Sequence, residues 1–149
     1  GVVYDDAERS FAEIVRQTLP DDGPAVETAA EVQPFFIAEQ NRSGSTDVAD
    51  VSWVVPTAGM RAATWVPGTS AHSWQAIAAG GTSIGDKGMI VAAKTLAMTA
   101  LDLFSDPSLV DAARAEQQER IGPDFEYTPL LGDRDPPLDY RKAARPGGP

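Results

Sequence analysis

The side chains best suited to chemistry in this sequence surround a single histidine. His72 is the one histidine of the chain and stands in the stretch Gly-Thr-Ser-Ala-His-Ser-Trp, residues 68–74. Imidazole changes its charge near neutral pH and is a common metal ligand, so His72 is a candidate metal ligand or acid–base group. Its position after a strand-like run supports that interpretation, because open α/β sheets place ligands beyond the carboxyl ends of their strands. The alternative is a structural histidine satisfied by hydrogen bonds.

A second stretch, residues 81–85, matches the pattern G-x-S-x-G with Ser83 at its centre. A nucleophile elbow needs a strand directly before the serine and a helix directly after it. The preceding Gln-Ala-Ile-Ala-Ala-Gly is a poor strand, so a serine hydrolase using Ser83 and His72 is the weakest interpretation. A glycine-rich turn that opens a helix can also bind an anion through free N–H groups. A flexible connection into the helix is the simplest interpretation.

A third group of polar residues, Gly44, Ser45, Thr46 and Asp47, precedes a strand-like run. Short polar side chains in such a loop stabilise turns by bonding to the nearby backbone. They equally suit a set of hydrogen-bonding groups beside a substrate. The residues alone leave these two interpretations evenly balanced.

The elements expected to position these groups alternate in type. Residues 51–55 and 60–66 are rich in β-branched or aromatic residues and bounded by Pro or Gly, which predicts strands, and a short strand is expected before Pro34. Helical spacing predicts helices from Asp5 or Asp6 to about residue 19, over 89–104, and from Asp106 to about residue 120. The helix at 89–104 carries few charges, so we expect it to be mostly buried. The predicted class is α/β.

Composition excludes several classes of partner. The 149 residues, 42% of them hydrophobic, suit one globular domain, and the formal net charge of −10 argues against binding to nucleic acid or to an anionic membrane surface. No run of about 18 apolar residues is apparent, so no membrane-spanning segment is expected. The absence of cysteine excludes disulfides and thiolate metal sites, and fits a cytoplasmic location.

Three segments, in this order and spacing, resemble one known family. They are Gly-Ser-Thr-Asp-Val-Ala-Asp-Val-Ser-Trp-Val-Val-Pro-Thr from residue 44, the stretch around His72, and the segment from Asp86 to Arg114, followed by a closing Pro-Pro-Leu. The chain resembles the dinuclear metal-dependent aminoacylase and carboxypeptidase family of amidohydrolases. Within it, the most similar subgroup is the one that contains the B subunit of p-aminobenzoyl-glutamate hydrolase and dipeptidase-like amidohydrolases.

The resemblance implies a fold and a domain organisation. Residues 1–122 correspond to the C-terminal portion of a metallohydrolase catalytic domain, and residues 123–149 form a Pro-rich extended tail. The implied architecture is part of a three-layer domain of the zinc-exopeptidase type, a sheet flanked by helices, completed by another chain. That chain or fragment would carry a lid domain, through which whole assemblies would dimerise.

The resemblance also assigns roles to residues. His72 occupies the position of the family's last metal ligand, and two divalent ions are implied: zinc, or manganese in some relatives. Gly44, Ser45, Thr46 and Asp47 correspond to groups beside the substrate. The general-base glutamate and the remaining ligands have no counterpart in this chain, and the family's histidine-x-aspartate pair is excluded by the single histidine.

The implied function is hydrolysis of the amide bond of small substrates, active only with the rest of the enzyme. N-acyl amino acids, dipeptides and aminobenzoyl-glutamate-like compounds are the implied substrates. The alternative is a non-catalytic subunit or isolated fragment that only stabilises a partner chain. The metal content of the isolated chain distinguishes the two, and the apolar helix at 89–104 predicts a large hydrophobic contact with the partner.

Overall fold

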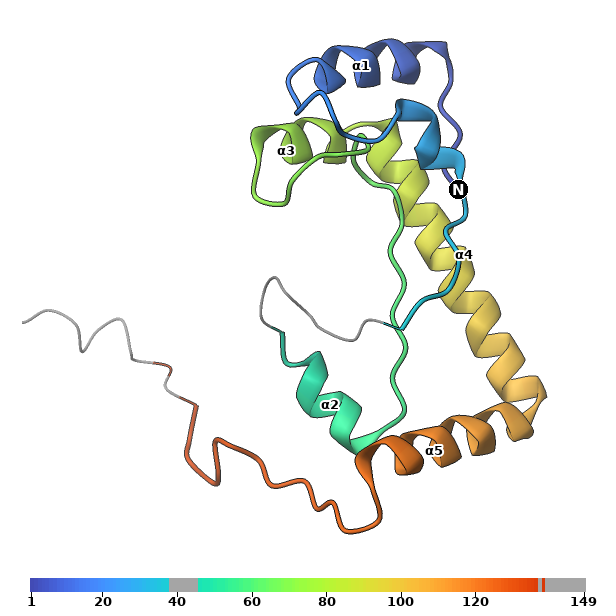
Figure 1. The fold of residues 1–149 in the computed structure, drawn as a ribbon, viewed down its shortest axis with the longest axis vertical. Coiled ribbons are helices and arrows are strands. Elements are labelled where there is room, and N and C mark those ends of the chain that lie inside the picture. Colours follow the sequence, from blue (N-terminus) through green and yellow to red (C-terminus); the bar gives the residue numbers. More distant parts are fainter. Residues whose placement is uncertain (38–45, 137, 139–149) are drawn as a thin grey trace, which may run out of the picture.

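The structure is a computed structural model that describes residues 1–37, 46–136 and 138, and within these ranges every regular element is helical. The elements are, in chain order, α1 (Asp6–Arg16), the 3-10 helix η1 (Val26–Ala30), α2 (Val48–Val54), α3 (Trp74–Gly80), α4 (Ser83–Ser105) and α5 (Pro107–Ile121). Figure 1 shows α1, η1 and α3 gathered around the first turns of α4, while α5 starts at the other end of α4 and α2 lies beside the C-terminal end of α5.

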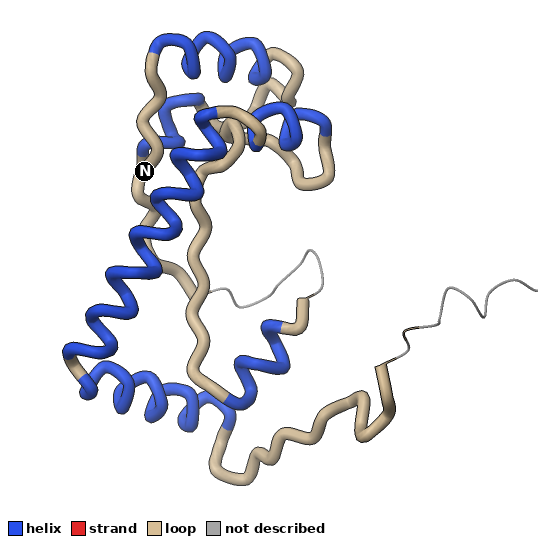
Figure 2. The backbone as a smooth tube through the Cα atoms, turned by 180° about the vertical axis from the view of Figure 1, so that it is seen from behind, coloured by secondary structure: helices blue, strands red, loops and turns tan. Residues whose placement is uncertain are grey.

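The predicted α/β class, with a three-layer sheet domain, is wrong for the described part of the chain, which contains no strand. Residues 51–55 largely belong to α2, where the N–H of Val55 donates to the carbonyl of Val51 at 3.0 Å. Residues 60–66 are non-helical and unpaired, running between α2 and the α1 end of the molecule (Figure 2). The short strand expected before Pro34 is replaced by η1.

The physical reason is that strand propensity is a preference for packing on a pleated surface beside a neighbouring strand. The β-branched and aromatic residues at 51–55 and 60–66 have that preference, but no second strand lies beside either run in the ranges described. Without such a neighbour, the backbone N–H and C=O groups must be satisfied locally or by water. α2 satisfies them through its own helical hydrogen bonds.

The three predicted helices are confirmed, as are the caps at Asp5 and Asp106. Helix α1 ends at Arg16, before the predicted residue 19, and α4 begins at Ser83, before the predicted residue 89. Asp5 caps α1: its carboxylate accepts from the N–H of Glu8 at 2.9 Å, and Glu8 accepts in turn from the N–H of Asp5 at 2.8 Å. This reciprocal capping box satisfies two of the otherwise unbonded N–H groups of the first turn. Asp106 caps α5, accepting from the N–H of Ser108 at 3.0 Å, with Pro107 as the first helical residue.

The hydrophobic core is small and lies at one end of the molecule. It consists of apolar side chains from α1, η1, α3 and the start of α4, with Val66 inserted from the extended segment, and Tyr4 and Phe11 packed at its edge. Ile84 and Val66 are its largest fully buried side chains. The core therefore fixes the N-terminal end of α4 and the turn that follows Val66.

Two glycines let α4 approach its neighbours closely. A Cβ at Gly85 would collide with the backbone of Gly80 at the end of α3, and a Cβ at Gly88 would collide with the carbonyl of Ala63 and lie 2.8 Å from Cγ2 of Thr64. Both obstacles include backbone atoms, which cannot rotate away. These glycines thus allow α4 to pack closely against α3 and the extended segment.

We expect Gly88→Ala to lower the free energy of unfolding by about 2 kcal/mol, because overpacking against backbone outweighs the better helix propensity of alanine. Gly81→Ala is the matched control, since its Cβ would meet nothing closer than 3.8 Å. Urea denaturation followed by circular dichroism measures both. Equal stability of the two variants would contradict the close approach of α4 and the extended segment.

Beyond its first turns, α4 leaves its apolar side chains exposed, contrary to the expectation of a mostly buried helix. The exposed side chains are Met89, Ile90, Leu96, Met98, Leu101, Leu103 and Phe104. Among the described helices, α4 alone has the length and composition that would suffice to cross a membrane, a criterion that core helices of soluble proteins also meet. The expectation that no segment spans a membrane stays a prediction.

Candidate functional site

His72 lies in an exposed turn between the extended segment and α3. The turn begins where the N–H of Thr69 donates to the carbonyl of Val66 at 3.1 Å, and it ends where the hydroxyl of Ser73 donates to the carbonyl of Ser70 at 2.7 Å. His72 has φ of 60°, a left-handed conformation that is uncommon outside glycine. Such a conformation is retained where the surrounding structure imposes it, and functional sites are enriched in it. The side chain is exposed to solvent.

The turn is attached to the C-terminal end of α1. Gly68 has φ of +87°, and a Cβ there would lie 3.3 Å from Cδ of Pro24 and 3.7 Å from Cδ1 of Leu19. The side-chain amide of Gln75 donates to the hydroxyl of Thr18 at 3.2 Å. The core at Val66 and these contacts fix the backbone on both sides of His72. The turn that carries its side chain is therefore held in place.

The polar residues near α2 are described in part. Thr46 and Asp47 are exposed, and the hydroxyl of Thr46 accepts from the N–H of Val48 at 3.3 Å. Asp47 stands at the N-cap position of α2 without a side-chain capping bond. Gly44 and Ser45 lie outside the described residues. Thr46 therefore has the local turn role that the sequence allowed, while the carboxylate of Asp47 makes no capping contact.

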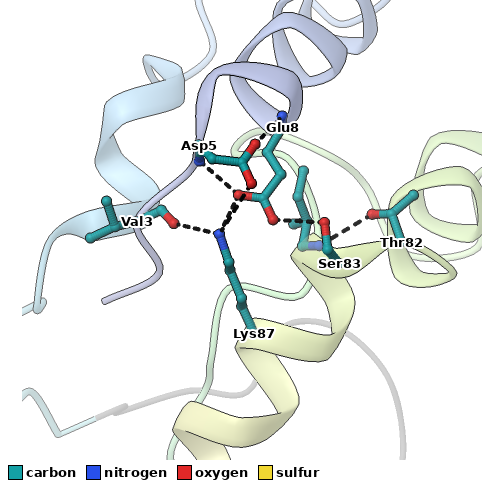
Figure 3. Close-up of polar contacts among 7 residues, drawn as sticks. Val3, Asp5, Glu8, Thr82, Ser83 and Lys87 are labelled. Carbon is teal, nitrogen blue, oxygen red and sulfur yellow. Dashed lines mark hydrogen bonds and ion pairs between the residues drawn. The ribbon is translucent and has the colours of Figure 1, made fainter.

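The structure brings together a polar cluster that joins α1 to α4 (Figure 3). The carboxylate of Glu8 is 5% exposed and forms an ion pair with the ammonium group of Lys87. It also accepts from the hydroxyl of Ser83 at 2.7 Å. Lys87 donates to the carbonyl of Val3 at 3.1 Å and lies 3.9 Å from the carboxylate of Asp5. This cluster is the one place where a charged side chain enters the described core.

These contacts hold the pKa of Glu8 well below its usual range, at about 2. The bond from Lys87 is the largest cause, followed by the hydroxyl of Ser83 and the N–H of Asp5, while burial acts in the opposite direction. Glu8 is therefore ionised at neutral pH, and its carboxylate accepts hydrogen bonds from Lys87, Ser83 and the N–H of Asp5. A carboxylate in this state suits a structural role better than proton transfer near neutral pH, because its pKa lies far below the working pH.

The same cluster decides the interpretation of the G-x-S-x-G pattern. Helix α3, not a strand, precedes the pattern, so the strand–turn–helix context of a nucleophile elbow is missing. Thr82 caps α4 by accepting from the N–H of Ile84 at 3.3 Å, and the hydroxyl of Ser83 is engaged by Glu8. Residues 81–85 are the start of a packed helix rather than a catalytic elbow.

A metal centre cannot be assembled from the described residues alone. No group of three or more histidine, aspartate or glutamate side chains converges within the ranges 1–37, 46–136 and 138. A zinc or manganese ion needs several nitrogen and oxygen ligands at one point. The side chain of His72 is exposed, and no other candidate ligand joins it in a group of three within the described ranges.

Sequence reasoning missed two arrangements of side chains. The spacing of Asp5 and Glu8 matches a capping box, and that signal was available, but nothing in the sequence links either residue to Lys87. A second arrangement gathers Trp53 and Tyr127 with two acidic residues near α2. The two acidic residues are Asp50 and Glu126. The four residues come from segments far apart in the chain, and no local sequence pattern predicts that they lie close together.

Comparison with known proteins confirms the resemblance predicted from the sequence. Over 91 residues the chain is 42% identical to the B subunit of p-aminobenzoyl-glutamate hydrolase from Escherichia coli (strain K12). The aligned part covers 61% of this chain and 19% of that protein, so it spans about a fifth of the relative's length. No protein-family model matches the chain, and no solved structure matches it.

Proposed function

We propose that this chain is part of a metal-dependent amidohydrolase and that it contributes His72 as a metal ligand. The observation that carries the proposal is the 42% identity, over 91 residues, to part of a hydrolase subunit. The stretch around His72 is one of the three segments on which the family resemblance rests. The exposed, anchored position of His72 supports the assignment.

The proposed reaction is hydrolysis of the amide bond of an N-acyl amino acid, a dipeptide or an aminobenzoyl-glutamate-like substrate. A pair of divalent ions, when bound, supplies an activated water and polarises the scissile carbonyl. His72 would hold one of these ions through a ring nitrogen. Asp47 and Thr46, with Gly44 and Ser45, are proposed to lie beside the substrate and to orient it by hydrogen bonds.

The proposal requires a second polypeptide, or a further part of the same one, that carries the remaining ligands and the general-base glutamate. The described residues hold no three-ligand group, and the matched relative is several times longer than the aligned segment. The apolar side chains along α4 are exposed and form the natural contact for such a partner. A stable contact of this hydrophobic kind buries above about 2,000 Å². Dimerisation of whole assemblies through a lid domain is a further part of the proposal.

A non-catalytic role is the second candidate. A chain that supplies a single exposed histidine and an apolar face also fits a subunit that only stabilises its partner. The two proposals differ in one respect, which is whether His72 touches a metal ion. Activity that survives the loss of His72 favours the second candidate.

The class of enzyme is tested on the assembled enzyme, meaning this chain combined with the part of the Escherichia coli relative outside the aligned segment. We expect a chelator such as 1,10-phenanthroline to abolish hydrolysis of aminobenzoyl-glutamate, and added zinc or manganese to restore it. A serine-directed phosphonate should leave the rate unchanged. Hydrolysis that resists the chelator and stops with the phosphonate would contradict the proposal.

A further inference from the structure

An aromatic pocket with acidic side chains lies between α2 and the segment that follows α5. It is a shallow, open pocket with a volume of about 360 Å³. Its lining residues include three aromatic, two acidic and one aliphatic residue: Trp53, Phe125, Tyr127, Asp50, Glu126 and Leu130. The pocket is distinct from the turn of His72 and contains no residue of the Glu8 cluster.

The aromatic wall is built by contacts between distant parts of the chain. The rings of Trp53 and Phe125 are stacked, with centroids 4.7 Å apart and planes inclined by 28°. The two residues remain 43% and 39% exposed, so part of their surface is accessible to a ligand. The amide of Gln117 donates to the carbonyl of Ser52 at 2.8 Å, which ties α5 to α2 beside this wall.

The polar side of the pocket is negative and oriented. The hydroxyl of Tyr127 donates to Oδ1 of Asp50 at 2.8 Å, and this bond raises the pKa of Tyr127, so the phenol stays neutral and keeps donating. The carboxylate of Asp50 is thereby held at the pocket, with its second oxygen not used by this bond. Glu126 is a second acidic residue of the lining, and no cationic residue is among the lining residues described.

We propose that this pocket binds a guanidinium group, carried either by a small molecule or by an arginine side chain of a peptide. A planar guanidinium stacks on aromatic faces and pairs with carboxylates through two parallel hydrogen bonds. Trp53 and Phe125 offer the aromatic surface, and Asp50 and Glu126 offer the carboxylates. An anionic ligand would face two like charges in the pocket and a net charge of −10 on the chain.

A compact ammonium group is a poorer match than guanidinium. It is more strongly hydrated and has no planar face to stack on the ring of Trp53. It also lacks the two parallel N–H donors that pair with a carboxylate. The cation–π attraction of either group to the aromatic rings adds to the charge pairing with Asp50. The geometry therefore predicts a preference for arginine over lysine. The proposal does not depend on the amidohydrolase function, because it concerns binding to this chain alone.

The test is isothermal titration calorimetry of the full 149-residue chain with N-acetyl-arginine amide. The same titration is carried out with N-acetyl-citrulline amide, which is its neutral isostere. The arginine compound is expected to bind at least tenfold more tightly, and N-acetyl-lysine amide to fall between the two. A Gly-Arg-Gly peptide amide distinguishes the sources: much tighter binding of the peptide indicates a peptide ligand, and equal binding a small molecule. Absence of binding by both arginine compounds, or equal binding of arginine and citrulline, overturns the proposal.

Variants locate the site. Asp50→Asn is expected to weaken arginine binding at least fivefold, whereas Asp124→Asn, which removes a neighbouring charge that does not line the pocket, should leave it unchanged. Glu126→Gln is the second test should Asp50→Asn unfold, as judged by circular dichroism, and it is expected to weaken binding at least threefold. Unchanged binding in a folded pocket variant, or equal weakening in Asp124→Asn, would show that the pocket is not the site.

Discussion

Lys87→Met is expected to lower the free energy of unfolding by about 2 kcal/mol. The substitution keeps most of the side-chain length but leaves the buried carboxylate of Glu8 without its cation, and an unpaired buried charge is strongly destabilising. Lys87 is 40% exposed, so water partly compensates, and the expected loss is below the range for a fully buried pair. Thermal or urea denaturation measures it.

Two further variants isolate the interaction. Lys94→Met on the exposed part of the same helix is the matched control and should change stability by less than about 0.5 kcal/mol. Adding Glu8→Gln to Lys87→Met should recover part of the loss, because a neutral amide can still accept from Ser83 and from the N–H of Asp5. If Lys87→Met and Lys94→Met unfold alike, the ion pair does not support the core.

The pH dependence of stability follows from the same carboxylate. The pKa of Glu8 is lowered from its ordinary value of 4.5 to about 2, so the unfolded chain binds its proton at a higher pH than the folded chain. The stabilisation from Glu8 is therefore complete above pH 4.5 and is lost as the pH falls from 4.5 towards 2. The Glu8→Gln variant should lack this part of the acid dependence, and a parallel loss in both proteins would contradict it.

His72→Ala is expected to lower hydrolysis by the assembled enzyme by at least about 100-fold. Changes to groups that merely support a metal ligand already cost roughly 10- to 100-fold in affinity or activity, and removing the ligand itself should cost more. Metal affinity should fall in parallel, because the proposed site would lose a nitrogen donor. The rate of aminobenzoyl-glutamate hydrolysis and the zinc dissociation constant are the two measurements.

Asp47→Asn is the comparison for His72→Ala. We expect it to retain metal while lowering kcat/KM, because its proposed contact is with the substrate. Loss of metal from Asp47→Asn would instead make Asp47 a ligand. Wild-type rate and metal affinity in His72→Ala would remove His72 from the site and favour the non-catalytic alternative.

The sequence predicted the helices well because their signals are local. Asp5 and Asp106 are side chains that cap whatever helix follows them, and the apolar spacing of residues 89–104 defines a helix whether or not anything covers it. The predicted strands were wrong because a strand needs a neighbouring strand to pair with, and the local sequence does not show whether one is present. The expected burial of α4 failed for the same reason, since Leu96 and Phe104 are apolar but remain 63% and 86% exposed among the described residues.

The site was predictable only in its local parts. His72 could be singled out by its uniqueness and by the resemblance of its surroundings, but its left-handed conformation and its anchorage to α1 are tertiary properties. The contacts of Glu8 with Lys87, and of Asp50 with Tyr127, join residues more than 70 positions apart. Nothing in either local sequence indicates its partner.

The most direct test of a metal site shared between this chain and its partner is a count of bound metal. Equilibrium dialysis against zinc, followed by elemental analysis, is carried out on the isolated 149-residue chain and on the assembled enzyme. The account predicts no tightly bound zinc on the isolated chain, about two ions per assembly as the family resemblance implies, and fewer in the His72→Ala assembly. An isolated chain that binds two ions and hydrolyses the substrate, or an active assembly that binds none, would contradict it.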